Sequence, residues 1–249
     1  MIIINSIKDK LEKSIGHSNP FIGFDELGKD WFVKTYLTKG GHETKALFNE
    51  VVAFSLAKKI DLPWPKGHVA QLSENVKSEL NVSISYVIAY EFIHDLEGLP
   101  EDYQFSNEKI YYLYGKSIFD NWLSIGDAKP DTCKLLNGEL IFMDAGIAFE
   151  DDSSGTWEEE GLEWKNSKLL VNSSPYHCGN LHSAEGYKPW FNKICAIPAE
   201  YYQSIADNIP DDWNVPETYK SKFVEVFLSS RERFIPMMKS CIEWELNHQ

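Results

Sequence analysis

Residues 125–146 read IGDAKPDTCKLLNGELIFMDAG, and this stretch indicates the fold more clearly than any other part of the chain. Asp127 stands in a Lys-Pro turn, a short hydrophobic hairpin follows, and Asp144 precedes Ala and Gly. The spacing of the two aspartates leaves room for a turn and two short strands. We therefore expect the hairpin to return Asp144 to a position beside Asp127.

The chain before this stretch alternates between strand and helix signals. Residues Pro20–Phe24 and Trp31–Leu37 are rich in β-forming side chains and flank a turn, so they predict a hairpin. Residues Thr44–Ile60 place their large apolar side chains on one helical face, and Asp-Leu-Pro ends the pattern. The apolar run Ile84–Phe92 predicts a further strand.

The chain after this strand is mostly helical in its pattern. A helix is expected at Asn107–Ser124, where apolar residues form a stripe, and another begins near Glu217. The run Leu140–Met143 predicts a short buried strand between them. This order predicts a two-lobed α+β fold, with a small strand-rich N-lobe at residues 1–93 and a mostly helical C-lobe at residues 94–249.

Composition limits the classes of partner. The net charge of −14 in 249 residues disfavours direct nucleic-acid binding, which depends on lysine and arginine at phosphates. Residues Met1–Ile7 resemble neither a signal peptide nor a membrane span, so we expect a cytoplasmic protein without membrane contact. The four scattered cysteines indicate reduced, packed thiols.

The residues that could carry chemistry occur in an informative order. Transfer of a phosphoryl group from ATP depends on the placement of charge: a strand lysine, a helical glutamate that orients it, and two carboxylates. Lys34 lies in the predicted strand WFVKTYL and Glu50 in the helix that follows. Asp127 and Asp144 then supply the carboxylates, so the chain offers one candidate for each role in the expected order.

Four segments carry a resemblance to a known family. The stretches GKDWFVKTYL, TKALFNEVVAFSLAKKIDLPWP, IFDNWLSIGDAKPDTCKLL and LIFMDAGIAF resemble the HipA-like kinases, which share the two-lobed protein-kinase-like fold. The resemblance runs roughly from Gly16 to Phe234. It implies a Ser/Thr protein kinase that uses ATP with Mg²⁺ or Mn²⁺, and a protein substrate or an antitoxin-like protein partner.

The resemblance also implies roles for individual residues. It assigns the covering of the phosphates to the turn with Gly16, His17 and Ser18, and nucleotide contact to Lys34 with its partner Glu50. It assigns adenine contact to Glu91 and Ile93. Asp127 is the implied catalytic residue and Asp144 the implied metal ligand.

The chain departs from the family pattern after Asp127. The family has Arg and His next and an Asn five residues after the Asp, whereas this chain has Ala128, Lys129 and Thr132. Lys129 is positioned to approach the γ-phosphate, as in the D-x-K-P-E-N motif of protein kinases. A hydroxyl at Thr132 is a weaker ligand for a second Mg²⁺ than an amide oxygen, and the neighbouring Asp131 offers a substitute.

Three functions therefore stay open from the sequence. The first is a HipA-like protein kinase. The second is a small-molecule kinase of the aminoglycoside-phosphotransferase kind, because GD-x-x-P followed by D-x-G resembles that family too and an acidic cleft attracts cationic substrates. The third is a nucleotide-binding pseudokinase, which the Thr132 departure favours. A fold by itself does not distinguish between them.

Overall fold

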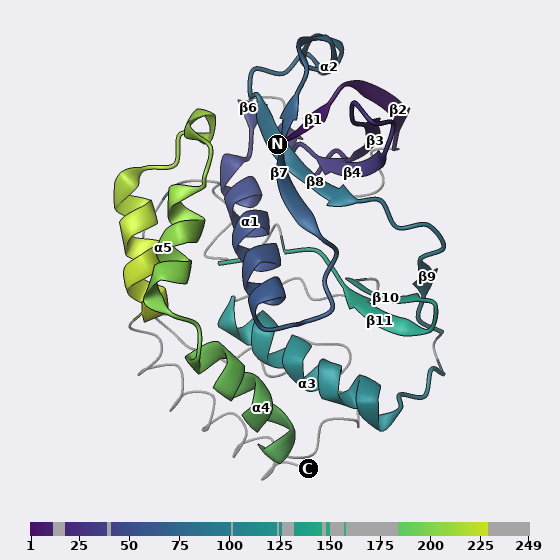
Figure 1. The fold of residues 1–249 in the computed structure, drawn as a ribbon, viewed down its shortest axis with the longest axis vertical. Coiled ribbons are helices and arrows are strands. Elements are labelled where there is room, and N and C mark those ends of the chain that lie inside the picture. Colours follow the sequence, from purple (N-terminus) through teal and green to yellow (C-terminus); the bar gives the residue numbers. More distant parts are fainter. Residues whose placement is uncertain are drawn as a thin grey trace.

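The structure is a computed structural model of the chain of 249 residues. It describes residues 1–11, 18–38, 41–100, 102–123, 125, 132–145, 148–149, 157 and 184–228. Within these ranges the protein combines a curled sheet with helices, so the predicted α+β class is confirmed (Figure 1).

The main sheet has six strands in the order β1-β7-β8-β4-β3-β2. All neighbours are antiparallel except β1 and β7, which run parallel. The strands are β1 (Ile2–Ile4), β2 (Ser6–Lys10), β3 (Phe21–Phe24), β4 (Asp30–Lys34), β7 (Gly67–Leu72) and β8 (Tyr86–Glu91).

The sheet curls because its two edge strands are consecutive in the chain. Only Asn5 separates β1 from β2, and its backbone N–H donates to the Phe24 carbonyl oxygen at 2.8 Å. The curl brings Ile4 close to Gly23, where an added Cβ would lie 2.6 Å from Ile4 Cγ2. Only glycine leaves room for this approach, and Ile4 becomes completely buried.

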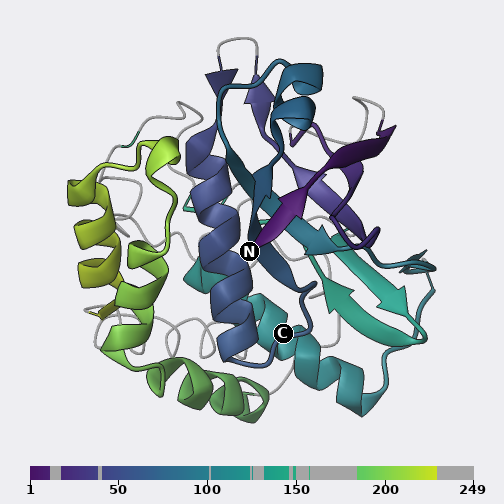
Figure 2. The same cartoon turned by 45° about the horizontal axis from the view of Figure 1, so that its top comes forward.

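Helix α1 (Thr44–Lys59) packs on this sheet and is buried on almost every side. A short hairpin of β5 (Leu37–Thr38) and β6 (Gly41–His42) leads into it. The predicted apolar face of α1 is buried as expected, but so are Asn49 and Glu50 on the other side. Helix α5 (Ala199–Asp207) lies beside α1 in Figures 1 and 2, which explains why α1 shows so little polar surface.

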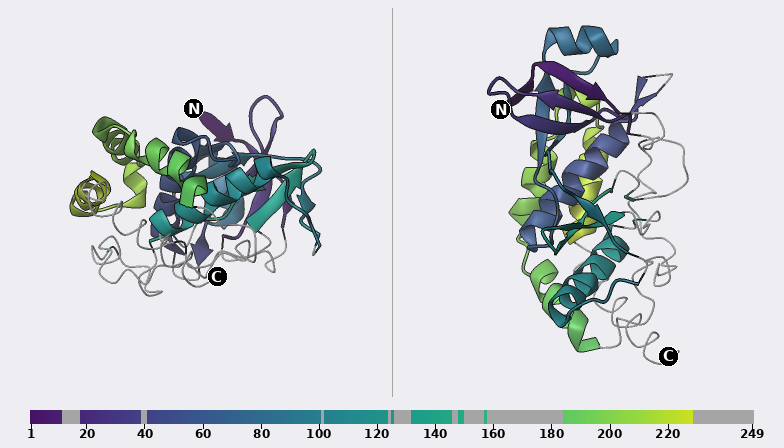
Figure 3. Two further views of the ribbon diagram at one scale, coloured as in Figure 1. Left: turned by 90° about the horizontal axis from the view of Figure 1, so that it is seen from below. Right: turned by 90° about the vertical axis from the view of Figure 1, so that its right-hand side faces the viewer.

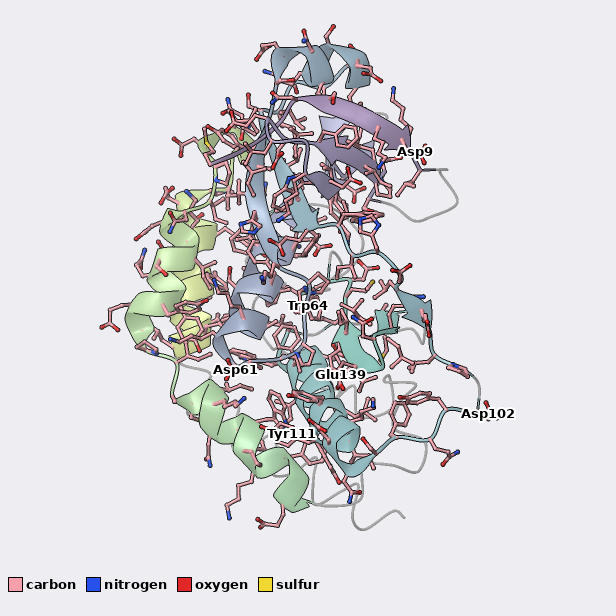
Figure 4. All side chains as sticks on the ribbon, turned by 45° about the vertical axis from the view of Figure 1, so that its right-hand side comes forward. Asp9, Asp61, Trp64, Asp102, Tyr111 and Glu139 are labelled. Carbon is pink, nitrogen blue, oxygen red and sulfur yellow. The ribbon has the colours of Figure 1, made fainter. Side chains whose placement is uncertain are left out.

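A second sheet and a long helix lie below the main sheet (Figure 3, right). Strands β10 (Cys133–Leu136) and β11 (Glu139–Phe142) form the predicted antiparallel hairpin, and β9 (Glu97–Gly98) pairs with β10. Helix α3 (Asn107–Trp122) packs against β11. The tip of the hairpin carries Glu139, and Trp64 lies between the hairpin and the upper sheet (Figure 4).

Helices α3 and α4 (Ala184–Cys195) cross closely at Gly115. A Cβ at Gly115 would lie 2.5 Å from Trp190 Cε2, so the indole occupies the space that a larger residue would need. The Trp190 ring also lies 4.8 Å, between ring centroids, from Tyr111, which is labelled in Figure 4. The two aromatic residues fix α4 against the end of α3.

Several hydrogen bonds tie the C-terminal helices to the sheet. In the 3₁₀ turn η4 (Asp211–Trp213), Asp212 Oδ2 accepts from the backbone N–H groups of Ser85 and Tyr86, at 2.5 and 3.3 Å. The Trp213 Nε1–H donates to the Tyr86 carbonyl at 2.8 Å. These hydrogen bonds join the strand-rich and helical regions in addition to the chain segment that runs from β8 to β9.

The elements that periodicity predicts are present with small differences at their ends. Strand β4 stops at Lys34 instead of reaching Leu37, because Tyr36 turns the backbone into the left-handed region with φ 50°. A helix does begin at residue 217 and is described to residue 228. The sequence patterns did not predict β1, β2, β7 or α2 (Glu74–Leu80). Of the described helices, none is long and apolar enough to cross a membrane.

Candidate active site

A cavity of about 420 Å³ opens between the main sheet and the β10–β11 hairpin. It brings together residues that the sequence placed in one site although they come from distant segments: Ser18, Lys34, Glu91, Ile93, Thr132 and Asp144. Gly16, His17, Asp127 and Lys129 lie outside the described residues. The division into lobes at residue 93 stays a prediction, although the cavity lies where the chain leaves β8.

Lys34 forms the centre of the charged wall of this cavity. Its Nζ lies 2.5 Å from Glu50 Oε1 and 3.1 Å from Asp144 Oδ1. Burial by itself would lower the pKa of the ammonium, but the charges of Glu50 and Asp144 outweigh burial and hold the pKa above its ordinary value. Lys34 therefore stays a cation throughout the pH range in which the protein would work.

Glu50 is completely buried and receives hydrogen bonds on both carboxylate oxygens. The Tyr36 hydroxyl donates to Oε1 at 2.6 Å, next to Lys34, and the Tyr90 hydroxyl donates to Oε2. Burial, followed by the charge of Glu50, raises the pKa of both tyrosines well above the ordinary value, so both hydroxyls keep their protons. Glu50 is thus fixed by three donors, and it fixes Lys34 in turn.

Asp144 follows β11 in a backbone conformation that few residues adopt. Its φ is 71°, in the left-handed region that Asp tolerates better than most residues other than glycine. The side chain is 59% exposed and lines the cavity while it contacts Lys34. Just beyond it, the Asn49 side-chain amide of α1 donates to the Ala148 carbonyl at 2.7 Å, which holds this segment against the helix.

Thr132 lies across the hairpin from Met143, the residue before Asp144. The Met143 N–H donates to the Thr132 carbonyl at 2.9 Å, so Thr132 and the residue before Asp144 are paired. Thr132 is 6% exposed and lines the same cavity. The resemblance expects an Asn here, and the structure brings this shorter side chain to the wall where Asp144 lies.

The oxygen atoms of this wall suit a magnesium ion. Asp144 offers a carboxylate and Thr132 a hydroxyl, and Mg²⁺ takes oxygen ligands, typically one or two carboxylates with water and phosphate oxygens. In the part of the chain that the structure describes, no cluster of three or more His, Cys, Asp or Glu side chains could hold a metal by itself. The donor set therefore fits a metal that arrives with a phosphate ligand.

Ser18 joins the segment before β3 to the end of β4. Its carbonyl oxygen accepts from the N–H groups of Thr35 and Tyr36, at 3.1 and 2.9 Å. These bonds hold Ser18 beside Lys34, at the wall of the cavity. Of the predicted phosphate-covering residues, Ser18 thus lies in the cavity wall with Lys34.

Sequence reasoning missed several residues of the site. The apolar lining at Phe32 and Met143 could have been found, because Phe32 lies two residues before Lys34 in β4 and Met143 directly precedes Asp144. The hydroxyls of Tyr36 and Tyr90 gave no signal, because each tyrosine reads equally well as an ordinary strand residue. Lys134, which also lines the cavity, reads in the sequence as a solvent-facing strand lysine.

Comparison with known proteins supports the fold and goes no further. No protein-family model matches the chain, and no curated protein matches it in sequence. The arrangement of a curled sheet, a buried helix and a helical region around one cavity is a protein-kinase-like fold. A crystal structure of the proinflammatory kinase CtkA from Helicobacter pylori is similar, with a TM-score of 0.56 over 99% of each chain and 12% sequence identity.

Proposed function

We propose that this chain is an ATP-dependent kinase of the HipA-like type, which transfers the γ-phosphoryl group to a Ser or Thr hydroxyl of a protein. The observation that carries the proposal is the position of Lys34 between Glu50 and Asp144 at the wall of a cavity of about 420 Å³. A cavity of this size suits a nucleotide-sized ligand. The kinase-like fold supports the proposal independently of the site.

The residues of the cavity would have different roles in phosphoryl transfer. Lys34 binds phosphate oxygens, and Glu50 with its two tyrosines keeps the ammonium in place. Asp127, which the structure does not describe, would orient the attacking hydroxyl and accept its proton, and Lys129 would approach the γ-phosphate. Glu91 and Ile93 line the cavity, and their backbone would contact the base.

Asp144 and Thr132 would hold the magnesium or manganese ion. When bound, such an ion neutralises negative charge on the phosphate oxygens. Glu50 and the exposed carboxylate of Asp144 together leave the cluster with an excess negative charge around Lys34. A divalent cation bound together with the phosphates of ATP would offset this excess.

A pseudokinase is the second candidate, and Thr132 favours it. A hydroxyl replaces the expected amide at a buried position on the metal-binding wall. A chain with one good metal ligand could bind nucleotide and transfer slowly or not at all. Both candidates predict nucleotide binding, so only turnover distinguishes them.

The test is incubation of purified protein with labelled ATP and Mg²⁺ or Mn²⁺, followed by mass spectrometry for phosphate on the chain or on added proteins. Asp127→Asn should abolish transfer and leave nucleotide affinity nearly unchanged, because that carboxylate acts on the hydroxyl. Transfer to cationic small molecules alone would support the aminoglycoside-phosphotransferase alternative. Nucleotide binding without any transfer would support the pseudokinase, and absence of nucleotide binding would reject both.

A further inference from the structure

Lys134 is a cation in a part of the cavity that is otherwise mainly apolar. It lies on β10 two residues after Thr132, so both side chains stand on the same face of the strand, and both line the cavity. Phe32, Ile93 and Leu96 line the cavity as well. The Lys134 side chain is half-buried and lines the cavity.

The Lys134 ammonium has no partner among the described residues. No hydrogen bond or ion pair joins it to them, whereas Lys34 in the same cavity contacts two carboxylates. Since none of the described residues pairs with this cation, a ligand that enters the cavity can contact it.

The hairpin register places Lys134 away from the charged wall. Lys134 pairs with Ile141 on one side and with Gly98 of β9 on the other. Two residues along a strand span about 6.6 Å, so the Cα of Lys134 lies that far from Thr132, in the direction of β9. Gly98 has no side chain that could cover it. The lysine thus belongs to the end of the cavity near the chain crossing at Phe92–Leu96, and not to the end where Asp144 lies.

Phe32 approaches the same cavity from the main sheet. It stands in β4 two residues before Lys34, and it pairs with Tyr90 of β8. A planar ring that enters between the sheet and the hairpin would meet Phe32 on one side and Lys134 on the other. Aromatic stacking and contact of a cation with a ring face both favour a flat, electron-rich ligand.

We propose that Lys134 binds the face of the nucleobase, opposite Phe32, and so makes this end of the cavity specific for an aromatic ring. The inference rests on the proposed function, because it takes the cavity as a nucleotide site. It adds a residue to those that the resemblance assigns to adenine contact, and it gives the Lys134 ammonium a ligand to contact. The phosphates remain with Lys34.

The test compares a nucleoside with its nucleotide. Lys134→Met keeps an unbranched side chain that is one atom shorter and removes its charge. Isothermal titration calorimetry then measures the affinities for adenosine and for ADP with Mg²⁺. We expect both ligands to bind roughly 3- to 30-fold more weakly than to the wild type, by a similar factor. Lys134→Arg should restore most of the affinity, and Lys188→Met, an exposed lysine on α4, should change nothing.

Two results would overturn the inference. A loss confined to ADP would mean that the ammonium binds phosphate, and unchanged affinity for both ligands would mean that it contacts neither. Phe32→Leu provides a second measurement, since loss of the ring should weaken the binding of adenosine as well.

Failure of the proposed function would look different. A wild-type chain that does not bind ADP would reject the nucleotide site and this inference with it. The second case is a wild-type chain that binds ADP, with weaker binding in Asp144→Ala. If Lys134→Met then binds ADP as tightly as the wild type, this inference alone is rejected.

Discussion

The hydrogen bond from Tyr90 to Glu50 permits a quantitative prediction. Glu50 is fully buried, and Tyr90 is the only described donor to its Oε2, since Lys34 and Tyr36 both contact Oε1. Tyr90→Phe removes the hydroxyl and leaves a buried carboxylate oxygen without that donor. A hydrogen bond to a charged group contributes about 1.5–3 kcal/mol, so we expect a loss of that size in the free energy of unfolding.

The expected loss can be measured by thermal unfolding. For a domain of this size, each kcal/mol corresponds to about 2–4 °C, so Tm should fall by roughly 3–12 °C. The ring of Tyr90 stays in place in the variant, including its edge-to-face contact with Phe54 at 6.1 Å between centroids. Any change therefore reports on the hydroxyl.

Tyr219→Phe is the matched control. Tyr219 is also completely buried, but its hydroxyl has no hydrogen-bond partner in the described part of the chain. Removal of an unsatisfied hydroxyl should leave stability unchanged or raise it slightly. Equal effects of Tyr90→Phe and Tyr219→Phe on Tm would refute the argument that Glu50 depends on its tyrosine donors.

The other predictions concern the metal wall and a buried thiol. Asp144→Ala should remove most of the rise in Tm that ADP with Mg²⁺ produces. Glu139→Ala, at an exposed position of the same hairpin, should retain that rise. An unchanged rise in Asp144→Ala would reject the site. Thr132→Asn should increase ATP turnover if Thr132 limits a competent site, because an amide oxygen completes the metal clamp, and no gain with either metal would reject that idea. Burial raises the pKa of the Cys133 thiol from 9.0 to about 12, so the folded protein favours the neutral thiol. Cys133 should therefore resist alkylation at pH 9 until the protein is unfolded. The stability that the neutral thiol contributes should be present below pH 9 and be lost as the pH rises from 9 towards 12. Fast labelling of Cys133 in the folded protein, followed by peptide mass spectrometry, would contradict the burial argument.

The sequence by itself determined the elements whose pattern is local. The hairpin of β3 and β4, the helix α1 and the hairpin of β10 and β11 were all predicted, because alternation and helical periodicity need only neighbouring residues. The order of Lys34, Glu50 and Asp144 could also be read directly. Chain order was enough to suggest which residues belong to one site, although it did not show that they touch.

Tertiary structure decided the contacts between distant segments. Lys34 and Asp144 are 110 positions apart and meet only because the sheet and the hairpin close on one cavity. Strands β1 and β2, within residues 2–10, had no clear sequence pattern. Their partners are other strands, since β1 pairs with β7 and β2 pairs with β3. Local propensity does not encode such pairing, because the stabilising surface belongs to another part of the chain.

The same reason explains why the sequence did not reveal the roles of Tyr36, Tyr90 and Lys134. Tyr36 and Tyr90 read as ordinary strand residues, and only packing around Glu50 makes their hydroxyls donors to a buried charge. Lys134 reads as a solvent-facing lysine until the hairpin folds against the sheet, half-buries it and leaves it without a partner among the residues that the structure describes. The sequence determined which charges are available, and the fold determined which of them are buried together, because the free energy of a charge depends on the water and the partners that folding removes or supplies.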